Sequence, residues 1–172
     1  MIEKYIPSCD AFILQKYKEL INHLKTLPRN NDSYGLIHYD AHWWNFFIND
    51  KNKITLFDFE ECNYNWFIND IAMVFFYNME PEYAHPNKER LFKHFLYGYS
   101  KENKLDLSFL KEIPHFFRLR EFALYSECYR QLEIDSNNVW CRNFIKDTKN
   151  RIENDIPWID FDFESLAEYI NV

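Results

Sequence analysis

The sequence has 172 residues, of which 47% are hydrophobic and 20% aromatic, and its formal net charge at pH 7 is −7. This length suits one domain with a substantial core, and the apolar content excludes a disordered chain. The excess of acidic residues argues against nucleic acid as a partner, because phosphate backbones are bound by clustered Lys and Arg. No apolar stretch approaches the roughly 18 uncharged residues of a membrane helix, so no membrane partner is expected.

The N-terminal residues and the cysteines together predict a cytoplasmic protein. Residues 1–7 contain no apolar stretch of the kind found in signal peptides. The four cysteines are widely separated and form no C-x-x-C pair, which favours reduced thiols over a zinc site or a disulfide framework. They are Cys9, Cys62, Cys128 and Cys141.

The first third of the chain reads as one helix followed by short strands. Apolar residues three and four apart predict a helix over residues 8–27, which Pro28 ends. Short apolar runs at residues 34–38, 45–48 and 54–57 predict strands. The last two are separated by Asn49-Asp50-Lys51-Asn52, which is typical of a hairpin turn.

The remainder of the chain is predicted to be helical. Residues 67–77 are apolar nearly all round, which indicates a buried helix. Pro114 is expected to separate a short helix from a longer one that runs to about Ile134. Further helices are predicted over residues 87–100, 138–154 and 163–170, the last capped by Asp162.

These elements predict a single domain, 1–172, that is mainly α with a small β-hairpin region. Its polar motifs fall within 35–75, and the helical residues 76–172 follow them. The chain has only two glycines, Gly35 and Gly98, and they are far apart. A Walker loop or a G-x-G-x-x-G phosphate loop needs several glycines close together, so neither is present.

The residues His38, Asp40 and Asn45 have the spacing H-x-D-x-x-x-x-N, and Asp58 follows the predicted hairpin. This is the spacing of a kinase catalytic loop, in which the Asp accepts the proton of the substrate hydroxyl and the Asn holds magnesium. Magnesium prefers hard oxygen ligands and takes one or two carboxylates from the protein. An Asn amide oxygen and a second Asp would meet that need.

Three ordered motifs resemble those of the aminoglycoside phosphotransferase and choline kinase superfamily, which shares the protein-kinase fold. The family pattern H-G-D-x-H-x-x-N corresponds to residues 38–45, I-D-F-D/E to residues 57–60, and D-[IL]-A to residues 70–72. The resemblance implies the C-terminal lobe of a protein-kinase-like fold. It also implies a kinase that uses ATP and Mg²⁺ to phosphorylate a small hydroxylated molecule, such as an aminoglycoside, choline or an amino alcohol.

Carried over to this sequence, the resemblance implies a role for each motif residue. Asp40 would be the catalytic base, and Asn45 and Asp58 the magnesium ligands. His42 would contact the γ-phosphate. His38 would brace the loop, and Asp70 would hold it through hydrogen bonds. The helical residues 76–172 would form the substrate subdomain.

The sequence departs from the family pattern in two places. Tyr39 replaces the usual Gly, which bears on how tightly the loop backbone turns. Only 34 residues precede Gly35, so the N-terminal lobe that grips ATP in the family is expected to be absent from this chain. Apolar surface should then be exposed near the hairpin, which would favour a homo-oligomer or an N-lobe partner.

Two alternatives remain open at this point. The chain could be a non-catalytic, truncated kinase-like module that binds a metabolite or another chain. It could also be a metallohydrolase that uses His38, Asp40, His42 and Asp58, because the first three alternate and would share one face of an extended strand. The metallohydrolase reading leaves Asn45 without a role.

Overall fold

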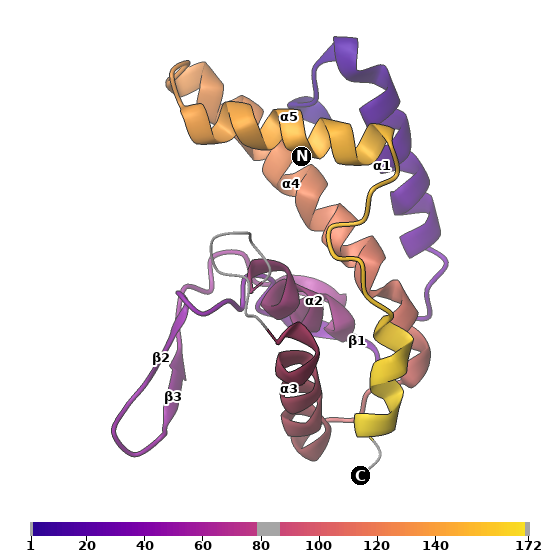
Figure 1. The fold of residues 1–172 in the computed structure, drawn as a ribbon, viewed down its shortest axis with the longest axis vertical. Coiled ribbons are helices and arrows are strands. Elements are labelled where there is room, and N and C mark those ends of the chain that lie inside the picture. The colour runs from indigo at the N-terminus through magenta and orange to yellow at the C-terminus, as the bar shows by residue number, and fades with distance from the viewer. Residues whose placement is uncertain (1, 79–86, 171–172) are drawn as a thin grey trace. The chain divides into compact units, whose positions relative to one another are not determined.

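The computed structural model describes residues 2–78 and 87–170. Five α-helices are present in that part of the chain, together with four strands in two antiparallel pairs (Figure 1). The helices are α1 (Ala11–Leu24), α2 (Phe67–Tyr77), α3 (Lys88–Glu102), α4 (Ile113–Ile134) and α5 (Val139–Glu153). The strands are β1 (Tyr34–Ile37), β2 (Phe46–Ile48), β3 (Ile54–Leu56) and β4 (Asn63–Trp66).

The fold class predicted from the sequence is confirmed: the protein is mainly helical, with a small β-hairpin formed by β2 and β3. The hairpin turn is stabilised by the side chain of Asn49, whose Oδ1 accepts hydrogen bonds from the backbone N–H groups of Lys51 and Lys53 at 3.0 Å each. None of the helices within the described residues combines the length and apolarity needed to cross a membrane.

Two elements differ from the sequence prediction. Strand β4 has no counterpart in that prediction, although its sequence Asn-Tyr-Asn-Trp alternates polar and aromatic residues over four positions. It pairs with β1 in antiparallel register, with Gly35 opposite Asn65. The last predicted helix is a 3₁₀ helix over Phe163–Tyr169, although Asp162 caps it as expected by accepting a hydrogen bond from the N–H of Glu164 at 3.1 Å.

The residues form two compact units. The first contains the chain up to Leu27 together with Phe117–Trp158, and the second contains Pro28–Phe116 and the chain from Ile159 onward. Helix α4 therefore begins in the second unit and continues in the first. All three sequence motifs lie in the second unit. Whether these two units make up one domain is not tested, so the single domain stays a prediction.

Helix α2 forms the core of the second unit and carries Asp70 near its N-terminal end. Its side chains Ile71, Met73 and Phe75 are fully buried, which confirms the predicted buried helix. Phe75 packs against Phe92 of α3, with ring centroids 4.0 Å apart. Burying each large apolar side chain stabilises the fold by about 1.5–3 kcal/mol. The packing therefore holds α2 in place, and Asp70 with it.

Gly35 in β1 lies where the strand passes close to the side chain of Phe67 at the start of α2. A Cβ atom at Gly35 would lie 2.7 Å from the ring of Phe67, closer than such atoms approach in proteins. The junction is also held by the N–H of Phe67, which donates to the carbonyl of Ser33 at 3.0 Å. The end of β1, from which the motif residues continue, is thereby fixed against α2.

In the first unit, the buried Asp10 joins the N-terminal segment to α4 and α5. Its carboxylate accepts hydrogen bonds from the hydroxyls of Tyr125 (2.6 Å) and Tyr129 (3.1 Å) and pairs with the ammonium of Lys149. Burial alone would raise the pKa of Asp10, but Lys149 and the two tyrosines outweigh it and hold that pKa below its usual 3.8. The charged form of Asp10 therefore stabilises the folded protein.

We expect Asp10→Asn to lower the free energy of unfolding at pH 7 by about 2 kcal/mol, because a buried, hydrogen-bonded charge is removed. A carboxyl whose folded-state pKa is depressed contributes stability above its unfolded pKa and loses it as pH falls through the folded pKa. The difference between the wild type and the variant should therefore narrow below about pH 4. Urea unfolding at pH 7 and pH 3 measures this, with the exposed Asp147→Asn on α5 as the control. A difference that is independent of pH would contradict the prediction.

Candidate active site

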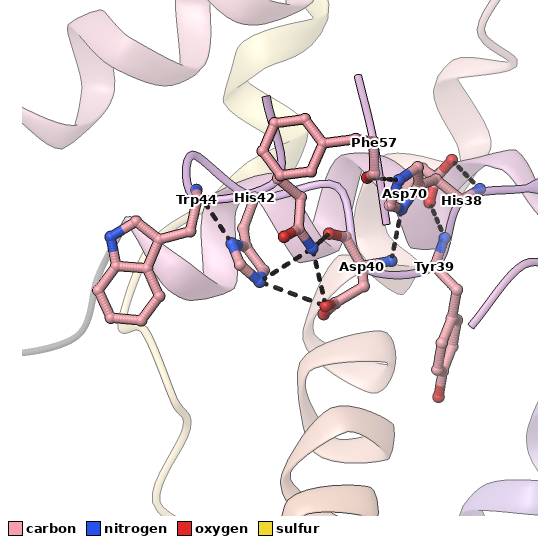
Figure 2. A network of polar contacts seen from close by, with 8 residues as sticks. His38, Tyr39, Asp40, His42, Trp44, Phe57 and Asp70 are labelled. Carbon is pink, nitrogen blue, oxygen red and sulfur yellow. Dashed lines mark hydrogen bonds and ion pairs between the residues drawn. The ribbon is translucent and has the colours of Figure 1, made fainter. Parts of the chain in front are cut away.

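The motif loop (residues 38–45) begins where β1 ends, and Asp70 of α2 holds its first turn. The two carboxylate oxygens of Asp70 accept hydrogen bonds from the backbone N–H groups of His38 (2.9 Å) and Tyr39 (2.7 Å) (Figure 2). Burial raises the pKa of Asp70 above its usual 3.8, and these two N–H donors oppose that rise. Asp70 thus has the loop-holding contacts that the sequence resemblance implied.

Tyr39 occupies the position where the family pattern has glycine, and its backbone has φ of 69°. A left-handed conformation costs a non-glycine residue roughly 1–2 kcal/mol. The hydrogen bond from the Tyr39 N–H to Asp70 helps to compensate for that cost. The loop consequently makes its tight turn without glycine, so the replacement does not open the backbone at this position.

His38 links the motif loop to the end of β3. Its Nε2 lies 2.9 Å from the carbonyl oxygen of Phe57, and its Nδ1 lies 3.3 Å from the N–H of Asp40. A carbonyl only accepts and an N–H only donates, so both contacts are satisfied by the neutral ring with its proton on Nε2. The ring is buried, as a brace between two segments should be.

These contacts weaken the metallohydrolase alternative. Both ring nitrogens of His38 are engaged with the backbone, so the ring offers no lone pair to a metal ion. The extended strand that would have placed His38, Asp40 and His42 on one face is also not formed, because β1 ends at Ile37. The alternation of His38, Asp40 and His42 therefore does not place their side chains on one strand face as metal ligands.

Asp40, His42 and Asn45 form a second cluster at the centre of the loop (Figure 2). The amide nitrogen of Asn45 donates to the backbone oxygen of Asp40 at 2.9 Å and to its Oδ2 at 3.0 Å. The Nε2 of His42 lies 3.3 Å from the same Oδ2. Because the Asn45 nitrogen faces Asp40, its amide oxygen is directed away from that carboxylate, which suits a role as a cation ligand.

Asp58 follows Phe57, whose backbone is hydrogen-bonded to the motif loop. The N–H of Phe57 donates to the carbonyl of Asn45 at 2.9 Å, while the carbonyl of Phe57 contacts His38. Asp58 itself has φ of 63° and an exposed side chain. The strand end is thus tied through Phe57 to both Asn45 and His38 of the motif loop, and the next residue, Asp58, has a left-handed backbone.

The structure therefore brings together five of the six predicted site residues by direct hydrogen bonds or ion pairs, and the sixth, Asp58, through Phe57. Sequence reasoning missed the part played by Phe57, because it acts through backbone atoms that any residue possesses. It also missed the exposure of Trp43 and Trp44 within the motif loop. The family pattern assigns no residue type to either position, so it gave no signal for these indoles.

Apolar side chains are exposed along the hairpin and just beyond it, as expected from the sequence. They are Phe47, Ile48, Ile54, Leu56, Phe57 and Phe59. An isolated two-stranded hairpin is only marginally stable in water, and exposed apolar patches of this kind usually mark an interaction site.

Comparison with known proteins identifies the class to which this fold and site belong. Residues 5–105 match the family model described as "Phosphotransferase enzyme family". This match covers more than half of the chain, and the chain belongs to that family.

Individual relatives are small-molecule kinases. The chain is 36% identical to amicoumacin kinase of Bacillus subtilis (strain 168), over 96% of this chain and 51% of the relative. It resembles the solved structure of amicoumacin kinase hAmiN in complex with AMP-PNP, Ca²⁺ and Ami, with a TM-score of 0.87 and 33% identity, covering 96% of this chain and 51% of that one. It shares its fold with a microcompartment-associated aminopropanol kinase at a TM-score of 0.65 and 18% identity, covering 87% of this chain and 46% of that one. The chain spans about half the length of these proteins.

Proposed function

We propose that this chain carries the catalytic and metal-binding part of an ATP- and Mg²⁺-dependent phosphotransferase that acts on a small hydroxylated molecule. The observation that supports this most strongly is the hydrogen-bonded convergence of the three motifs on Phe57, Asp70 and the motif loop. Catalysis of phosphoryl transfer depends on positioning and on neutralising charge. A braced loop that presents an aspartate beside hard oxygen ligands meets both requirements.

In this proposal Asp40 accepts the proton of the acceptor hydroxyl as that oxygen attacks the γ-phosphorus of ATP, and the bond from that phosphorus to the β–γ bridging oxygen breaks to release ADP. Asn45 and Asp58 would hold the metal ion, and their oxygen atoms are of the kind that Mg²⁺ prefers. The bound metal would neutralise charge on the phosphate oxygens. His42, held beside Asp40 at 3.3 Å, would contact the γ-phosphate. His38 and Asp70 would keep these groups in place.

The acceptor in this proposal is a cationic alcohol such as an amino alcohol. Glu60 and Glu61 are exposed on the segment that follows Asp58, and the chain carries a net charge of −7. Negative charge near a site attracts cationic ligands. One structural neighbour is named as an aminopropanol kinase, which agrees with this substrate class at the level of fold.

A thermal-shift measurement with Mg²⁺ and ATP, against Mg²⁺ alone, tests the proposal. At a hundred times the dissociation constant, ATP should add about 2.7 kcal/mol of stability, which in a protein of this size raises Tm by about 5–10 °C. Asp58→Ala should abolish the shift, because it removes a proposed metal ligand. Asp50→Ala, an exposed aspartate in the hairpin turn, is the matched control and should retain it.

No shift at millimolar ATP in the folded wild-type protein would contradict the proposal, as would a full shift in Asp58→Ala. That outcome would favour a second candidate function, a non-catalytic module that binds another chain. The exposed apolar side chains of the hairpin support this candidate. A protein that sediments as a monomer and shows a magnesium-dependent ATP shift would count against it.

A further inference from the structure

The first unit contains two cysteines that the proposed mechanism does not use, Cys128 on α4 and Cys141 in the first turn of α5. Both are free thiols, and their exposed fractions are only 1% and 2%. The two thiols are hydrogen-bonded to each other. The core of this unit therefore holds two sulfur atoms in contact, whereas Cys9 and Cys62 are exposed or half-buried.

The connection between α4 and α5, residues 135–138, is short and hydrogen-bonded throughout (Figure 1). The N–H of Asp135 donates to the carbonyl of Gln131 at 2.8 Å, and the N–H of Asn138 donates to the carbonyl of Asp135 at 3.2 Å. The side chain of Asn138 in turn accepts a hydrogen bond from the N–H of Cys141 at 3.0 Å. The backbone that carries Cys141 is thus tied directly to the end of α4, the helix on which its partner thiol lies.

We propose that Cys128 and Cys141 are a redox-active dithiol, which an oxidant of the disulfide class, such as oxidised glutathione, converts into a disulfide that links α4 to α5. The step is a two-electron thiol–disulfide exchange. The sulfur of one cysteine attacks a sulfur of the oxidant and releases its first thiol. The second cysteine then displaces the other thiol as the S–S bond of the protein forms. The two protons of the cysteines pass to the two released thiols, so the protein is oxidised and the oxidant is reduced.

The exchange should be slow in the folded protein. Burial and the hydrogen bond with Cys141 raise the pKa of Cys128, and a thiol that keeps its proton is a poor nucleophile. The oxidant must also reach two sulfur atoms that are almost inaccessible. The position of the equilibrium, more than its rate, therefore distinguishes a dithiol from two cysteines that only fill the core as small apolar residues.

The disulfide would close a loop of about 14 residues, which restricts the unfolded chain. For a loop of this length, the folded protein should favour the disulfide about 100-fold more than the unfolded chain does. The oxidised protein should accordingly melt about 6–12 °C above the reduced protein. The inference does not depend on the proposed function, because neither cysteine belongs to the motif loop.

The test uses the full chain with Cys9→Ser and Cys62→Ser, which leaves the buried pair as its remaining cysteines. This variant is equilibrated in a series of reduced and oxidised glutathione buffers, starting from both reduced and oxidised protein. Urea just below the unfolding transition is added to speed the exchange. Intact mass after alkylation should show both thiols lost together without bound glutathione, and the Tm should rise by about 6–12 °C. Adding Cys141→Ala, which leaves Cys128 alone, is the matched control and should abolish both changes.

The inference is overturned if the pair stays reduced in the most oxidising buffer, or if each thiol carries a glutathione and no intramolecular disulfide forms. A Tm that is unchanged or lower after oxidation would also overturn it, because the disulfide would then not fit the native α4–α5 connection. A cooperative urea transition in each reduced variant establishes that it is folded before oxidation.

Discussion

Replacement of Asp40 by alanine or asparagine should lower phosphoryl transfer by about 10²–10⁴-fold, the usual contribution of a positioned general base. The Asp40→Asn variant keeps the shape of the side chain and an oxygen to accept the hydrogen bond from Asn45, so the loop should remain folded. The loss should therefore appear in kcat, while the thermal shift caused by Mg²⁺ and ATP persists. ADP release in the presence of an amino alcohol acceptor measures kcat and KM for each variant.

The exposed Asp32→Asn provides the matched control for this experiment, because it removes a carboxylate of the second unit outside the motif loop. Its turnover should equal that of the wild type. Turnover that is unchanged in Asp40→Ala would show that another group accepts the proton, and the assignment of Asp40 would be wrong. A variant that fails to fold is recognised by the loss of the cooperative urea transition.

Replacement of Asp70 by alanine should lower the free energy of unfolding by about 2–3 kcal/mol, because the N–H groups of His38 and Tyr39 lose their acceptors. The desolvation that raises the pKa of Asp70 offsets part of its stabilising effect, so the loss should not exceed this range. The midpoint of urea unfolding should fall with an unchanged m value. Asp70→Asn keeps one acceptor oxygen and should lose about half as much.

A second substitution separates the loss of hydrogen bonds from backbone strain. Tyr39→Gly should stabilise the protein by about 1 kcal/mol if the left-handed backbone dominates, since glycine adopts φ of 69° without steric cost. In the double variant Asp70→Ala/Tyr39→Gly, part of the stability lost in Asp70→Ala should return. No recovery would show that Tyr39 is not strained in the native loop. The hydrogen bond from the Tyr39 N–H to Asp70 would then not be offsetting backbone strain at Tyr39.

The site could be predicted from the sequence to the extent that its residues are fixed by local spacing. His38, Asp40 and Asn45 lie on one loop, so their separation in the chain already limits their separation in space. Helix α2 could be predicted because its apolar residues extend round the whole helix. The same argument does not apply to β4, whose alternation of polar and aromatic residues covers only four positions and which forms a strand by pairing with β1.

The sequence by itself determined the chemical groups of the candidate site, the order of the helices and membership of the kinase-like class, because each depends on residue type and on short-range spacing. The tertiary structure alone decided that the carbonyl of Phe57 engages His38, that Asp70 holds the turn at Tyr39 and that Trp43 and Trp44 remain exposed. The physical reason is that these features depend on backbone atoms and on the packing of segments more than ten residues apart, which no local pattern encodes.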